Sequence, residues 1–124
     1  MAEYENIYDE KKRLKLFNRE KKKLTKILEK IAEDKMSIAE GLIHTAAWQR
    51  VMLIELTEMI QRDGYVERYQ NGENQFGIKK SSAVEVYDKT VNTYSKIIKQ
   101  LCDLLPEEES RTAPGQALME FISK

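Results

Sequence analysis

Residues 64–105 read GYVERYQNGENQFGIKKSSAVEVYDKTVNTYSKIIKQLCDLL and contain two adjacent patterns of different period. In the second pattern, apolar residues recur at alternating spacings of three and four, which places them on one face of a helix. Such a face needs a cover, and an intrachain helix, a neighbouring subunit or both can supply it. The seven apolar residues are Val84, Tyr87, Val91, Tyr94, Ile98, Leu101 and Leu105.

The first pattern, residues 64–80, predicts a β-hairpin with its turn at Asn71-Gly72. Ser82 precedes Glu85 by three residues, a capping-box spacing that predicts a helix start at about Ser82. Pro106 is expected to end that helix. The residues that favour strands are Tyr65, Tyr69, Phe76 and Ile78.

Two further helices are predicted upstream, from about Asp9 to Glu33 and from Met36 to Gln61. The second is apolar on two sides, with Ile38 on one of them. We expect the 82–105 helix to cover one side, and the first helix or a neighbouring subunit to cover the other. The apolar face of the first helix comprises Leu14, Phe17, Leu24, Leu28 and Ile31.

The charge of the chain is concentrated in one segment, although the whole chain carries 21 basic and 21 acidic residues. Residues 11–26 contain nine basic residues and one acidic residue, Glu20, which leaves a local net charge of +8. At 100° per residue, most of the bases project from the side opposite the apolar face. We call the following set the basic ridge: Lys12, Lys15, Arg19, Lys22, Lys23 and Lys26.

A line of basic side chains suits contact with DNA phosphates, and an ordinary solvated helix face remains an equally open interpretation. The hairpin residues offer a second possible DNA reader, in the manner of a β-ribbon. Packing of the hairpin on an adjacent subunit is favoured over that role. The hairpin residues concerned are Tyr65, Arg68, Tyr69, Phe76, Lys79 and Lys80.

The composition argues against an enzyme, a metal-binding protein and a membrane protein. A chain of 124 residues forms one domain with a modest core, and such chains often oligomerise. His44 is the only histidine and is expected to lie between helices, while Cys102 is expected to be a buried small hydrophobe. We therefore expect no enzyme activity, no cofactor and no metal site. No membrane span or secretory signal is predicted, so the cytoplasm is the expected compartment.

The segment 107–124 begins with a polar run that contains Pro114 and Gly115 and reads as a linker. Behind it, Leu118, Phe121 and Ile122 share one helical face and are a candidate docking site, with a disordered tail as the alternative. The expected organisation is a basic helix (1–34), a helical oligomerisation core with the hairpin at 64–80 (35–106), and the linker with its docking segment (107–124).

Over about residues 35–110 the chain resembles the small terminase subunits of tailed bacteriophages, in the P27 group. The resemblance lies in the helix end at Gly64, the hairpin YQNGENQFGIKK (69–80), the Ala83-Val84 helix start and the Leu104-Leu105-Pro106 exit. It implies a mainly α fold: a helical hairpin core, a β-hairpin between the second and third helices, and a homo-oligomeric ring.

The resemblance also implies a function: a subunit that binds double-stranded viral DNA and presents it to the large terminase subunit, the ATPase and nuclease, in the host cytoplasm. The C-terminal residues Leu118, Phe121 and Ile122 would then dock on the large subunit. One alternative is a dimeric helical DNA-binding regulator that is unrelated to packaging. Another is a coiled-coil scaffold in which the lysines only maintain solubility.

Overall fold

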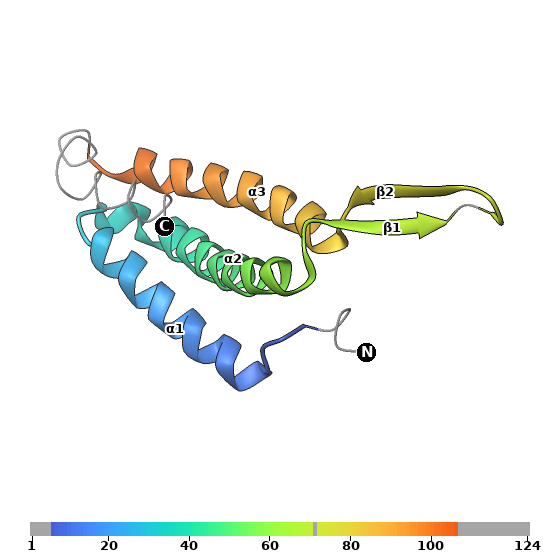
Figure 1. Cartoon of the computed structure of the whole chain (residues 1–124). Helices are drawn as coiled ribbons and strands as arrows, with labels where there is room; N and C mark the ends of the chain where they lie inside the picture. Colours follow the sequence, from blue (N-terminus) through green and yellow to red (C-terminus); the bar gives the residue numbers. More distant parts are fainter. Residues whose placement is uncertain (1–5, 71, 107–124) are drawn as a thin grey trace.

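The computed structural model of the protein describes residues 6–70 and 72–106. Figure 1 shows α1 and α3 lying along α2, while the β1–β2 hairpin extends beyond the end of the helices. This arrangement confirms the predicted mainly helical fold with a hairpin between the second and third helices. In chain order the elements are α1 (Glu10–Ile27), the short 3₁₀ helix η2 (Glu33–Lys35), α2 (Met36–Asp63), β1 (Val66–Gln70), β2 (Phe76–Lys80) and α3 (Ser82–Leu104).

The main core lies between α2 and α3, as the apolar stripe on residues 82–105 predicts. The C-terminal half of that stripe is fully covered: Tyr94, Ile98 and Leu101 are at most 2% exposed. Small residues of α2, including Ala39 and Ala46, let the two helices approach each other, and both alanines are completely buried. In the N-terminal half, Val84, Tyr87 and Val91 are only half-buried.

The second side of α2 is covered by α1 of the same chain. Phe17 packs against Ala47 and Val51 in a separate small cluster, and Trp48 stacks on the Phe17 ring with centroids 4.2 Å apart. Leu24 of α1 reaches the main core and is completely buried. The two apolar sides of α2 are therefore covered by α3 and α1 of the same chain.

Four details of the predicted elements are wrong. α1 ends at Ile27 instead of Glu33, because Leu28 and Ile31 are buried within the bend that leads to α2. Leu14 is 51% exposed, since this end of α1 contacts α2 through Tyr8 and Arg13 instead. Ile38, in the first turn of α2, is 62% exposed.

The fourth correction concerns the cap of α3. Ser81, not Ser82, is the N-cap residue, and its hydroxyl accepts the backbone N–H of Val84 at 3.2 Å. Ser82 is the first helical residue, so the predicted start of the helix is confirmed. The strands pair antiparallel from Val66 opposite Lys80 to Gln70 opposite Phe76. Residues 71–75 connect them and include the predicted turn former Asn71-Gly72.

Candidate nucleic-acid interface

The basic ridge lies on the outer side of α1. Phe17 and Leu24 hold the opposite side of the helix against α2, so the ridge faces away from the body of the protein. The helix begins at Asp9, whose carboxylate accepts the backbone N–H of Lys12 at 2.7 Å. All six ridge residues are exposed: Lys12, Lys15, Arg19, Lys22, Lys23 and Lys26.

The one acidic residue within the ridge segment, Glu20, is buried beneath it. Its side chain is 3% exposed and forms ion pairs with Arg19 at 3.1 Å and with Lys23 at 3.8 Å. Both bases remain more than half exposed. Glu20 therefore orients two ridge cations on the surface, and it offsets part of the local positive charge.

The other ridge lysines take less part in ion pairs. Within residues 6–70 and 72–106, Lys15, Lys22 and Lys26 form no ion pair. An open depression of about 750 Å³ lies among Asn18, Arg19, Lys21, Lys22, Thr25, Lys26 and Glu29, and a second lies among Asp9, Lys11, Lys12, Lys15, Leu16 and Arg19. These lysines are thus available to anionic groups from solvent.

The two depressions add Lys11 and Lys21 to the candidate interface, and the sequence prediction omitted both. At 100° per residue, Lys11 falls 20° from Lys22, so angular position would have included it. At the same spacing Lys21 falls 40° from Phe17, beside the apolar side of α1, and its ammonium lies 5.8 Å from the centre of the Phe17 ring. Lys21 joins the candidate interface because it lines the first depression.

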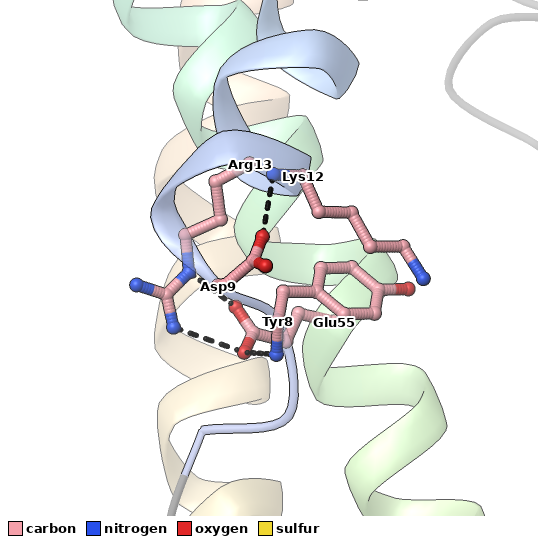
Figure 2. A network of polar contacts seen from close by, with 5 residues as sticks. All are labelled: Tyr8, Asp9, Lys12, Arg13 and Glu55. Atoms are coloured by element: carbon pink, nitrogen blue, oxygen red, sulfur yellow. Dashed lines mark hydrogen bonds and ion pairs between the residues drawn. The ribbon is translucent and has the colours of Figure 1, made fainter.

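A buried carboxylate fixes the start of α1 on α2. Glu55 accepts the backbone N–H of Tyr8 at 2.9 Å, and it accepts Nε and Nη2 of Arg13 at 3.0 and 3.1 Å (Figure 2). Its side chain is 8% exposed, whereas that of Arg13 is 32% exposed. Lys12 extends over the Tyr8 ring, with its ammonium 4.1 Å from the centroid. The ridge thus begins at a firmly anchored turn.

The electrostatics of this anchor are consistent with an ionised pair. Burial alone would raise the pKa of Glu55, but the hydrogen bonds from Arg13 and from the Tyr8 backbone hold it below the usual value. The same contact with Glu55 raises the pKa of Arg13. Burial, with a hydrogen bond to Glu58, raises the pKa of Tyr8 to about 12. The network is therefore charged and intact at neutral pH.

The hairpin also presents aromatic and basic side chains, but two of its lysines already form ion pairs. Lys79 pairs with Glu67 at 3.4 Å, and Lys80 pairs with Asp88 of α3 at 3.2 Å. Of the predicted hairpin set, all six residues are exposed: Tyr65, Arg68, Tyr69, Phe76, Lys79 and Lys80. As an anionic-ligand surface, the hairpin is weaker than the ridge.

The two chemically reactive side chains do not form a common site. His44 is exposed and meets the edge of the Phe17 ring, with centroids 4.9 Å apart, so its predicted place between helices is only partly right. Cys102 is half-buried beside the main core, and burial raises the pKa of its thiol. In the described ranges, no cluster of His, Cys, Asp and Glu is placed to hold a metal ion, and none of the described helices is long and apolar enough to cross a membrane.

The predicted docking residues Leu118, Phe121 and Ile122 lie outside the described residues.

A scan against models of protein families, a search of curated proteins and a search of solved structures each found no match.

Proposed function

We propose that this protein is a DNA-binding subunit without catalytic activity of its own, equivalent to the small terminase subunit of a tailed phage. In the host cytoplasm it binds double-stranded viral DNA and presents it to the large terminase subunit, which carries the ATPase and nuclease. The single observation that carries the proposal is the exposed basic ridge on α1, whose opposite side is buried against α2.

The length of the ridge suits a DNA backbone. Lys12 and Lys26 are fourteen residues apart, which corresponds to about 21 Å along a helix. One DNA strand presents a phosphate every ~3.4 Å of axis, so the ridge spans about six phosphates. Contacts of this kind release counterions and depend little on base sequence. They suit a protein that must hold DNA firmly while another subunit acts on it.

Repetition of the ridge in a homo-oligomeric ring strengthens such binding. Each exposed ion pair contributes little, about 0–1 kcal/mol for a surface pair. Linked copies convert later contacts into intramolecular events and gain avidity through effective concentration. A modest core between α2 and α3 is in keeping with a chain that completes its buried surface by self-association.

The contact with the large subunit is proposed to use Leu118, Phe121 and Ile122 of the docking segment 116–124, which follows the predicted linker 107–115. This part of the proposal rests on the sequence pattern and on the terminase resemblance. Deletion of residues 116–124 should leave assembly and DNA binding unchanged and weaken capture of the large subunit in a pull-down. An undiminished complex would remove the docking role from these residues.

The DNA-binding role is tested by charge reversal at Lys15, Arg19, Lys22 and Lys26. The four substitutions to Glu should reduce retention of a DNA duplex at moderate salt by at least tenfold, while the far-UV circular dichroism stays unchanged. The matched control reverses four exposed lysines elsewhere and reaches the same net charge, so general repulsion is equal in both variants. The control lysines are Lys35, Lys89, Lys96 and Lys99.

Equal losses in the two variants would refute the assignment of the ridge, because only net charge would then matter. Undiminished retention in the ridge variant would refute it as well. The dimeric-regulator alternative shares the ridge and differs in subunit number, since regulators follow two-fold operator symmetry. Light scattering during size exclusion separates the two: a mass above a tetramer supports the packaging role, and a dimer favours the regulator.

A further inference from the structure

The β1–β2 hairpin has two chemically different faces. Because side chains alternate along a strand and Gln70 pairs with Phe76, one face collects alternate residues from both strands. We call this the outer face, and it comprises Val66, Arg68, Gln70, Phe76, Ile78 and Lys80. Three of its side chains are apolar and widely exposed: Val66 (58%), Ile78 (67%) and Phe76 (70%).

The side chains on the opposite face of the hairpin contact other residues of the same chain. The Tyr69 ring lies over Gly77, so closely that an added Cβ at Gly77 would clash with it. Glu67 pairs with Lys79 at 3.4 Å and accepts the Ser82 hydroxyl at 3.4 Å at the start of α3. These contacts hold the hairpin relative to α3. On the outer face Lys80 pairs with Asp88 of α3 at 3.2 Å, but the apolar side chains Val66, Phe76 and Ile78 stay widely exposed.

An uncovered outer face is unfavourable for a hairpin of this size. A two-stranded hairpin is marginally stable by itself in water, and this one extends beyond the helices (Figure 1). Two apolar residues of β2, Phe76 and Ile78, and the diagonal neighbour Val66 form a continuous patch. Contiguous exposed apolar patches larger than a few hundred Å² often mark interaction sites. This patch is therefore a candidate surface for a partner.

A complementary surface lies at the root of the hairpin on each copy of the chain. A groove of about 410 Å³ runs between α2 and the start of α3. Met52 and Val86 on its walls are 43% and 44% exposed. Its charged residues, Arg13 and Glu55, neutralise each other through their ion pair. The apolar lining comprises Met52, Leu56, Met59, Ala83 and Val86.

We propose that the outer face of the hairpin docks in this groove on a second copy of the chain. The contact is head-to-tail, because the two surfaces differ and each copy carries both. A symmetric contact between two outer faces is disfavoured, because it would bury the Arg68 cations of both copies in one interface. Lys80 is already paired with Asp88. In the groove, the cation Arg13 is already paired with Glu55. Repetition of one head-to-tail contact generates a ring or a filament.

The C-terminal segment of the same chain is a poorer occupant. It leaves the helices at Pro106, at the end of α3 remote from the hairpin (Figure 1). The 23 residues of α3 span about 33 Å at 1.5 Å per residue. The groove residues Ala83 and Val86 lie about 30–35 Å from Pro106 along the helix. The twelve residues from Pro106 to Leu118 reach at most about 40–43 Å when fully extended, so docking of Leu118 in the groove would take up about three quarters of that reach.

The proposal rests on the homo-oligomeric part of the proposed function and is independent of DNA binding. The hairpin variant combines Phe76→Ser with Ile78→Ser, and the groove variant combines Met52→Lys with Val86→Lys. The matched control combines Leu14→Ser with Ile38→Ser, which removes similarly exposed apolar groups that line neither the hairpin's outer face nor the groove. Circular dichroism checks that each variant keeps its helices, and light scattering during size exclusion gives the masses.

The wild type and the control should have the same mass, larger than a dimer, and each docking variant alone should be a monomer. An equimolar mixture of the two docking variants should form a dimer, since the intact hairpin of one fits the intact groove of the other. A symmetric interface predicts no such rescue, so a mixture that stays monomeric overturns the proposal. A monomeric wild type, or docking variants of unchanged mass, overturns it too.

Two further outcomes separate this inference from the proposed function. Loss of mass on deletion of residues 107–124, with docking variants unaffected, would identify the C-terminal segment as the occupant and overturn the proposal. A docking variant that is monomeric but still binds DNA through the ridge supports the inference. An oligomer that assembles as described yet retains no DNA supports the inference and refutes the packaging role.

Discussion

Replacement of Glu55 by Gln should destabilise the protein by about 2–3 kcal/mol. The substitution removes the charge that accepts two bonds from Arg13 and one from the Tyr8 backbone. Loss of one member of a buried ion pair costs about 3–5 kcal/mol. Here the cost is smaller, because the Arg13 side chain is 32% exposed and can turn to water.

The assay is urea unfolding at pH 7, followed by circular dichroism at one fixed protein concentration. With an m value of about 1.5 kcal/mol/M, the midpoint should fall by about 1.3–2 M. Glu40→Gln is the control, because Glu40 is exposed on the same helix, and surface changes of this kind stay within about ±0.5 kcal/mol. If Glu55→Gln proves as mild as Glu40→Gln, the network does not anchor α1.

Two other predictions concern the same structure. The difference in unfolding free energy between the wild type and Glu55→Gln should be constant above about pH 5 and should shrink as the pH falls below the usual glutamate pKa of about 4.3. The sign follows because the pKa of Glu55 is lowered in the folded protein, so its stabilisation is present above the unfolded pKa and disappears in acid. A difference that grows in acid would contradict this. Ile98→Ala should cost about 2–5 kcal/mol, since Ile98 is completely buried between α2 and α3. Ile38→Ala should cost less than about 1 kcal/mol, and thermal unfolding that ranked the two in the opposite order would refute the assigned packing.

The helices and the hairpin were predictable because their patterns are local. The spacing from Tyr94 to Leu105 marks a buried helical face, and in the structure that face meets α2. The β-branched and aromatic residues around Gly72 likewise indicate two strands. Such patterns can be recognised from the residues of a single helix or hairpin.

The errors arose where contacts between distant residues decide the outcome. Leu28 and Ile31 continue the apolar spacing of α1, yet they fill the bend before α2, so the helix ends earlier than its pattern indicates. Glu55 resembles any other carboxylate of a highly charged chain. Its partners Arg13 and Tyr8 are 42 and 47 residues away, and no local rule connects them.

The candidate interface was predictable in part for the same reason. Angular spacing on a single helix identified the basic ridge, and every ridge residue is exposed in the structure. The burial of Glu20 beneath Arg19 and Lys23 was not predictable, because it depends on how closely α1 lies on its neighbours. The division of the hairpin into a face with contacts inside the chain and a face with exposed apolar side chains depends on strand register, which was not predicted from the sequence.

The salt dependence of DNA affinity reports whether the basic ridge contacts DNA phosphates. The logarithm of the binding constant is measured against the logarithm of salt concentration for three proteins: the wild type, the ridge variant Lys15→Gln/Lys22→Gln/Lys26→Gln, and a control with Lys89, Lys96 and Lys99 changed to Gln. The account predicts a steep negative slope for the wild type and for the control. In the ridge variant the slope should be shallower by at least about 2.7, three phosphates at ~0.9 each. An unchanged slope in the ridge variant, or an equal change in the control, would contradict the account.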